Sequence, residues 1–203
     1  IKQQEIFDDI YQLLLVELKK HHIHIINEQT LDEDQQDFVK FFFDDEILSN
    51  LFPILIDETT SFPYLADNSS YLFAKLISQK NEKNIKFALI EIPTKTNSRF
   101  VILPNKGNEQ FVILLDDVIR FCANDIFTVL GYKVGESYNI KLTRDAELDI
   151  DNDLTQSLIS KISKSLKKRE KGAPVRLVVD GNISKDMLAF LMHKLKLGKN
   201  DQP

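Results

Sequence analysis

The sequence YLFAKLISQKNEKNIKFALIEI, residues 71–92, decides the fold class because it contains two short apolar runs separated by a polar turn. The runs YLFAKLIS and NIKFALIEI are rich in residues that favour β-structure, and Gln, Lys, Asn and Glu lie between them. They predict two neighbouring strands. Similar runs occur on both sides, in PILID (53–57), RFVILP (99–104) and FVILL (111–115). The middle of the chain therefore predicts consecutive strands.

Segments with helical periodicity precede and follow these strands in the sequence. Apolar residues at helical spacing predict an amphipathic helix over residues 2–20, a short strand over 23–26 and a second helix over about 31–50. Thr30 and Glu33 have the spacing of a capping box for the second helix. The later segments predict a helix from Asp116, a strand 137–143, a helix 154–171, a strand 174–180 and a helix capped by Ser184.

The order of these elements predicts an α+β fold. We expect a mixed, mainly antiparallel sheet flanked by helices, with an N-terminal helical pair. A chain of 203 residues that is 43% hydrophobic can bury one sizeable core. We therefore predict a single domain over residues 1–203, with residues 1–50 as a helical segment packed on it.

Composition excludes several classes of protein. The sequence has no run of about 18 apolar residues and no signal-peptide pattern, which predicts a soluble cytoplasmic protein. Its single cysteine, Cys122, lies in an apolar-periodic segment and is expected to be buried. Because the chain begins with Ile1 and ends in a polar stretch, we expect it to be a piece of a longer protein.

The charge is unevenly distributed along the chain. Residues 1–153 carry 15 basic and 27 acidic residues, whereas residues 154–203 carry 11 basic and 4 acidic ones. The basic end could meet a polyanion or an acidic neighbour, or the two parts could neutralise each other. In the predicted helix 154–171, the lysines could follow a phosphate chain, although a charged face is more often simply solvated.

Three consecutive phenylalanines, Phe41, Phe42 and Phe43, lie in the second predicted helix. At about 100° per residue they cannot all share one apolar stripe. A helix wedged between two layers of its own domain would explain them. The alternative is an aromatic patch for another subunit or domain, where Phe is enriched.

The sequence contains no recognisable motif for phosphate transfer or metal binding. Its six glycines form no nucleotide-binding loop, and one cysteine without an H-E-x-x-H motif excludes the usual zinc sites. His22 and His24 would share a strand face as metal ligands, but no third ligand is evident. His193 has no orienting acid at helical spacing, which makes it a weak candidate for a phosphorylated nucleophile. We predict no catalytic, cofactor-binding or metal-binding residue.

Six segments, taken in order, carry a resemblance to a known family. They are INEQTLDEDQQDFVKFFFDDEI (26–47), LFPILID (51–57), RFVILP (99–104), FVILLDDVIRFCANDIF (111–127), KLTRDAELDID (141–151) and GAPVRLVVDGNISKDML (172–188). Together they resemble the middle, or head, domain of the polyphosphate kinases of the histidyl-phosphate class. The TRDAE stretch and the start of the PVRL strand are the most specific parts.

The resemblance implies a parent enzyme that transfers the terminal phosphate of ATP to polyphosphate reversibly through a phosphohistidine. In this family the catalytic histidines and the magnesium and nucleotide ligands belong to C-terminal domains. ATP and Mg²⁺ are thus implied for the parent, and none of the histidines here is assigned a catalytic role. The head domain is associated with dimerisation and with shaping the polyphosphate path. A stand-alone polyanion-binding module that uses the basic face 161–171 is the alternative.

Five basic residues are the candidates for contact with polyphosphate or with another domain: Arg144, Lys161, Lys164, Lys168 and Arg176. A guanidinium group forms a planar fork that matches phosphate and keeps its charge near neutrality. Arg144, however, immediately precedes an acid-rich stretch that would repel polyphosphate. We therefore favour an ion pair between elements or domains for Arg144 over direct phosphate contact.

Overall fold

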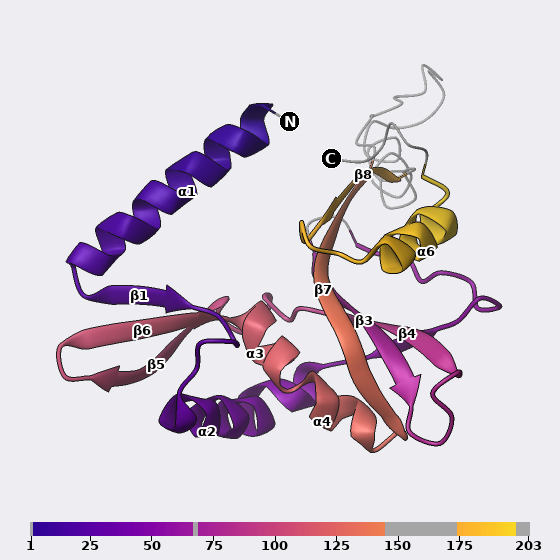
Figure 1. The fold of residues 1–203 in the computed structure, drawn as a ribbon, viewed down its shortest axis with the longest axis horizontal. Helices are drawn as coiled ribbons and strands as arrows, with labels where there is room; N and C mark the ends of the chain where they lie inside the picture. The colour runs from indigo at the N-terminus through magenta and orange to yellow at the C-terminus, as the bar shows by residue number, and fades with distance from the viewer. Residues whose placement is uncertain (1, 67–68, 145–173, 198–203) are drawn as a thin grey trace, which may run out of the picture. The chain divides into compact units, whose positions relative to one another are not determined.

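The computed structural model describes residues 2–66, 69–144 and 174–197 (Figure 1). The chain forms two compact units, each built from separate segments. The first contains Ile1–Leu55 and Leu72–Ser137, and the second contains Ile56–Tyr71 and Tyr138–Pro203. The single domain over residues 1–203 stays a prediction.

A small mixed sheet lies in the first unit. Its order is β1-β6-β5, formed by β1 (Ile23–Ile26), β6 (Glu109–Leu114) and β5 (Phe100–Lys106). β1 runs parallel to β6, whereas β5 runs antiparallel to it. The parallel pair joins segments that are more than eighty residues apart, so this sheet ties the N-terminal segment to the middle of the chain.

The larger sheet has the order β2-β4-β3-β7-β8. It is formed by β2 (Ile54–Ile56), β4 (Ile85–Glu91), β3 (Ser70–Ser78), β7 (Tyr132–Arg144) and β8 (Pro174–Val179). β3 and β4 confirm the two strands predicted from residues 71–92, and the Ser78 N–H donates to the Asn84 carbonyl across their turn at 3.1 Å. In the second unit, the last part of β7 pairs antiparallel with β8.

The apolar run of β3 is continuous because both of its faces are covered. Leu72 and Leu76 belong to the core cluster of the first unit. Phe73, which points to the opposite face of the strand, stacks on Phe87 of β4 with the ring centroids 5.4 Å apart. A strand buried on both sides shows a continuous hydrophobic run instead of strict alternation.

The N-terminal helices match the prediction in position but differ at one cap. They are α1 (Lys2–Lys20) and α2 (Glu33–Phe42), and a π-helical turn (Phe43–Ile47) and a 3-10 turn (Leu48–Asn50) continue α2. The predicted capping box of Thr30 and Glu33 is wrong. Asp32 accepts from the Gln35 N–H at 3.2 Å, and the Gln35 side chain accepts from the Asp32 N–H. Thr30 instead donates to the Asn27 carbonyl, which places it in the preceding turn.

The remaining helices follow the predicted order. α3 (Leu115–Phe121) and α4 (Ala123–Thr128) belong to the first unit, and α6 (Lys185–Leu195) belongs to the second. The Ser184 side chain is at the N-cap of α6 but makes no capping hydrogen bond. None of the helices in the described parts of the chain is both long and apolar enough to cross a membrane. The predicted helix 154–171 lies outside the described residues.

Candidate functional site

The structure brings two of the five predicted basic residues to the same end of one strand pair. Arg144 is the last residue of β7 and is paired through its backbone with Pro174 of β8, while Arg176 lies opposite Thr143. The Arg176 side chain is exposed. Arg144 and Arg176 are therefore close along this ladder although they are far apart in sequence. Lys161, Lys164 and Lys168 lie outside the described residues.

The three phenylalanines do not form one surface. Phe41 is 68% exposed, whereas Phe43 is only 1% exposed and belongs to the core of the first unit. Phe42 packs against that core and stacks on Phe38 at 6.2 Å. The three side chains therefore do not share one exposed patch, because Phe43, like Ile47 in the same π-helical turn, faces inward. Of the three side chains, that of Phe41 is the most exposed.

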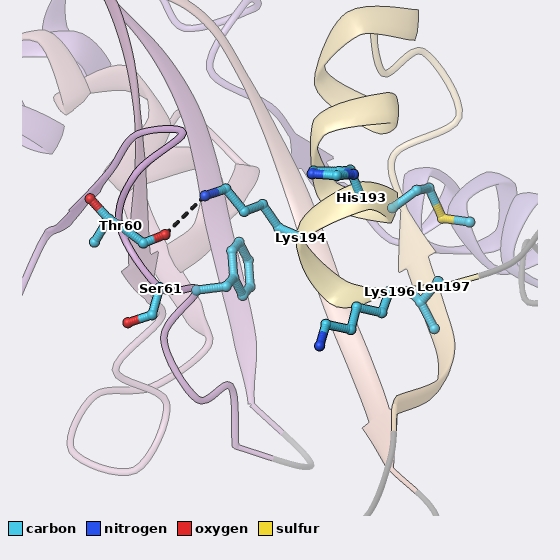
Figure 2. A pocket seen from close by; sticks show the side chains of 8 residues that line it. Thr60, Ser61, His193, Lys194, Lys196 and Leu197 are labelled. Carbon is cyan, nitrogen blue, oxygen red and sulfur yellow. Dashed lines mark hydrogen bonds between the residues drawn. The ribbon is translucent and has the colours of Figure 1, made fainter.

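A pocket of about 730 Å³ lies within the second unit, between the C-terminal end of α6 and the segment 60–62 (Figure 2). Its polar lining comes from Thr60, Ser61, His193, Lys194 and Lys196. Phe62, Met192 and Leu197 supply apolar surface. The sequence indicates His193 as a candidate but cannot reveal this pocket, since its two walls are more than 120 residues apart.

Lysine and threonine contacts hold the two walls of the pocket together. Lys194 Nζ donates to the carbonyl oxygens of Glu58 at 2.7 Å and Thr60 at 2.9 Å. The hydroxyls of Thr60 and Thr59 donate to Asp57 Oδ1, and these hydrogen bonds hold the pKa of Asp57 well below its usual range. The segment 57–60 is therefore ordered by its own turn and anchored to α6.

Three polar side chains of the pocket remain available to a ligand. Within the described parts of the chain, the side chains of Ser61, His193 and Lys196 have neither a hydrogen bond nor an ion pair. Lys196 has φ 56 and ends α6, with its N–H bonded to the carbonyls of His193 and Met192. This closure satisfies carbonyls that would otherwise repel an anion at the negative end of the helix.

A second polar cluster joins β1 to β6 in the first unit. His22 Nδ1 lies 2.7 Å from Glu109 Oε1, and His24 Nε2 is hydrogen-bonded to Glu109 Oε2. The His24 ring also stacks on Phe111 at 5.1 Å. Hydrogen bonds from His24 and then His22 lower the pKa of Glu109 below its ordinary 4.5. The sequence could not reveal Glu109 as the partner, because it is 87 positions after His22.

Replacing Glu109 by glutamine is expected to lower the unfolding temperature near neutrality. A carboxyl group whose pKa is depressed by folding stabilises the protein above its ordinary pKa and loses this contribution as pH falls through the folded value. The difference between wild type and Glu109→Gln should therefore be clear at about pH 6 and shrink well below 4.5. Thermal unfolding followed by circular dichroism measures it. Glu82→Gln, at a carboxylate that is 82% exposed, is the control and should change little.

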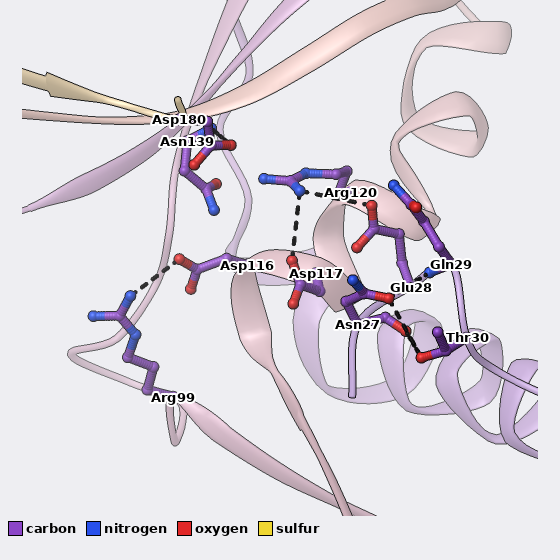
Figure 3. A network of polar contacts seen from close by, with 10 residues as sticks. All are labelled: Asn27, Glu28, Gln29, Thr30, Arg99, Asp116, Asp117, Arg120, Asn139 and Asp180. Atoms are coloured by element: carbon purple, nitrogen blue, oxygen red, sulfur yellow. Dashed lines mark hydrogen bonds and ion pairs between the residues drawn. The ribbon is translucent and has the colours of Figure 1, made fainter. Parts of the chain in front are cut away.

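A network of paired charges, in which the carboxylates are more buried than the arginines, lies elsewhere in the first unit (Figure 3). Arg99 forms an ion pair with Asp116 at 3.2 Å, and Arg120 lies 3.6 Å from both Glu28 and Asp117. The sequence predicts helix-start acids at 116 and 117, which is confirmed, but both are also buried and paired. Their arginine partners, by contrast, can be identified only from the tertiary structure.

The other candidate chemistries receive no support from the described residues. No group of three or more His, Cys, Asp or Glu in residues 2–66, 69–144 and 174–197 has the geometry to hold a metal ion. Cys122 is 2% exposed, which confirms the prediction of a buried thiol. Burial raises the pKa of Cys122 to about 12, so the reactive thiolate is disfavoured near neutrality.

Comparison with known proteins gives one consistent result. The family model for the polyphosphate kinase middle domain matches residues 34–202. The polyphosphate kinase of Vibrio vulnificus is 37% identical over 205 residues, and that of Escherichia coli K12 is 34% identical. Both alignments cover 99% of this chain and 29% of the relative, so the chain spans less than a third of these proteins.

A solved structure shows the same fold. The crystal structure of polyphosphate kinase from Porphyromonas gingivalis matches with a TM-score of 0.77 and 23% sequence identity, over 100% of this chain and 28% of that one. At this identity the match supports the α+β fold alone. The family match, which covers most of the chain, establishes membership: the chain belongs to the polyphosphate kinase middle-domain family.

Proposed function

We propose that the chain is the non-catalytic head domain of a cytoplasmic polyphosphate kinase. The parent enzyme would use ATP and Mg²⁺ and transfer the terminal phosphate of ATP reversibly to polyphosphate through a phosphohistidine. The observation that carries this proposal is the extent of the match, which includes residues 34–202 of this chain but only 29% of the Vibrio relative. Most of the length of such a protein lies outside the matched region, and its catalytic groups would be located there.

The surroundings of the histidines support a non-catalytic role. His22 and His24 both use a ring nitrogen on the same carboxylate, Glu109, in a contact that joins two strands. His193 has no acid oriented toward it among the described residues, and lysines accompany it in the pocket. A phosphorylated nucleophile needs a group that orients its ring, as well as cations that stabilise the transferred phosphate.

The proposed role in the parent has two parts. The first is self-association, for which Phe41 offers an exposed aromatic side chain on α2. The second is shaping the path of polyphosphate, for which Arg144 and Arg176 lie near each other at one end of the β7–β8 ladder. For Arg144, an ion pair with another element or domain remains our preferred proposal, with phosphate contact as the alternative.

The chain incubated with ATP labelled on the terminal phosphate and Mg²⁺ is expected to acquire no label and to make no polymer. Phosphohistidine is acid-labile, so label is measured after separation at neutral and at acidic pH. A full-length polyphosphate kinase serves as the positive control. Acid-labile label that disappears in the His21→Ala, His22→Ala, His24→Ala or His193→Ala variant would contradict the proposal. Label that persists in all of these variants would identify a contaminating kinase.

A further inference from the structure

We propose that the pocket between α6 and the segment 60–62 binds a chain of phosphates, with Lys196, His193 and Ser61 as its ligands. The choice of polyphosphate as the occupant rests on the proposed function. The site differs from the predicted basic face at 161–171 and from the arginines of the β7–β8 ladder. It is formed entirely by residues of the second unit.

The available donors favour an anion. Lys196 supplies an ammonium group, His193 a ring N–H and Ser61 a hydroxyl, and none of these side chains is engaged within the described residues. Lys194 adds a second positive charge to the same wall, although its ammonium already donates to two carbonyls. Charge-assisted hydrogen bonds to phosphate oxygens are shorter and stronger than neutral ones.

The acceptor groups beside the pocket already accept hydrogen bonds. Asp57, the acid of the adjoining turn, accepts hydrogen bonds from Thr59 and Thr60. The carbonyls of Met192 and His193, at the negative end of α6, accept from the N–H groups of Leu197 and Lys196. The pocket therefore has a positive lining with few free acceptors, as phosphate oxygens require.

The volume of the pocket favours a chain over a single phosphate. At about 730 Å³ it is within the range of small-molecule sites. His193 and Lys196 are exposed side chains on one wall, and Ser61 is exposed on the other. Donors on two walls of an open pocket can contact successive phosphates of a linear anion, whereas one phosphate would leave part of the donor set unused.

Calorimetric titration of the 203-residue chain at low ionic strength, with tripolyphosphate and separately with orthophosphate, tests this inference. We expect tripolyphosphate to bind more tightly, with an affinity that falls as salt is added. Lys196→Gln should weaken tripolyphosphate binding about tenfold, the effect of losing one charge-assisted hydrogen bond. His193→Gln should also weaken it, and this second variant leaves the residue with φ 56 unchanged.

Lys185→Gln is the matched control. Lys185 is exposed at the opposite end of α6, and its replacement removes the same charge from the same helix. Its effect should stay within about twofold. Thermal unfolding of all three variants checks that they are folded, and amide shifts at Ser61 and His193 in NMR spectra locate the ligand.

Three outcomes would overturn the inference. They are the absence of tripolyphosphate binding, equal weakening by Lys185→Gln and Lys196→Gln, and equal affinity for orthophosphate and tripolyphosphate. Equal weakening would show general charge attraction, and equal affinities would show a site for a single phosphate. None of these outcomes affects the phosphoryl-transfer experiment, so failure of the pocket is distinguishable from failure of the proposed function.

Discussion

Replacing Phe43 by alanine is expected to lower the free energy of unfolding by about 3–5 kcal/mol. Phe43 is 1% exposed and is among the largest fully buried side chains. Its removal loses the transfer free energy of the ring and leaves a cavity that the surrounding core fills only in part. Urea unfolding of the 203-residue chain, followed by circular dichroism, measures the effect.

Phe41→Ala provides the matched control, with the same chemical change two residues earlier. Because Phe41 is 68% exposed, the substitution should change the free energy of unfolding by less than about 0.5 kcal/mol. If Phe41 contributes to self-association, the same variant should weaken the dimer in sedimentation experiments. A large loss of stability in monomeric Phe41→Ala, or a small loss in Phe43→Ala, would contradict the assignment of these faces.

Replacing Arg120 by methionine is expected to cost about 3 kcal/mol of unfolding free energy. The Arg120 side chain is 21% exposed, and its partners Glu28 and Asp117 are 13% and 12% exposed. Without the guanidinium group, two largely buried carboxylates would lose their compensating charge. Urea unfolding at neutral pH measures the loss.

Two further variants test the electrostatic explanation. Adding Glu28→Gln and Asp117→Asn to Arg120→Met should recover part of the lost stability, because neutral amides are less costly to bury than carboxylates. Lys133→Met removes a pair with the same 3.6 Å separation in which Lys133 is 54% and Glu82 is 82% exposed. It should cost less than about 1 kcal/mol. Equal effects of Lys133→Met and Arg120→Met would show that burial does not determine the contribution.

Local sequence patterns predicted most of the secondary structure. The helix over residues 2–20 and the strand over 23–26 agree with α1 and β1. The turn between β3 and β4 is also local, and its polar residues made the pair recognisable. The error at the α2 cap has a local cause too, because Thr30 and Asp32 both precede the helix and only one can cap it.

The contacts of the site residues join distant parts of the sequence, so the sequence alone could not predict which residues are partners. Glu109 contacts His22 and His24 because β1 pairs with β6. Arg120 contacts Glu28 because both belong to the first unit, although they are far apart in the sequence. The pocket residue Lys194 contacts carbonyls more than 130 positions earlier. Hydrophobic periodicity identifies elements but does not specify which elements are neighbours, so these partners could not be found from spacing.

The chain passes from one unit to the other after Leu55, after Tyr71 and after Ser137. A recombinant fragment that starts at Tyr138 would therefore lack Asp57, Glu58 and Thr60, and with them the acceptors that anchor Lys194. Attempts to isolate the pocket by truncation would need to fuse residues 56–71 to the C-terminal segment, as in a circularly permuted protein. A single cut at any of these three positions would separate the two segments of at least one unit, and a cut after Tyr71 would divide both.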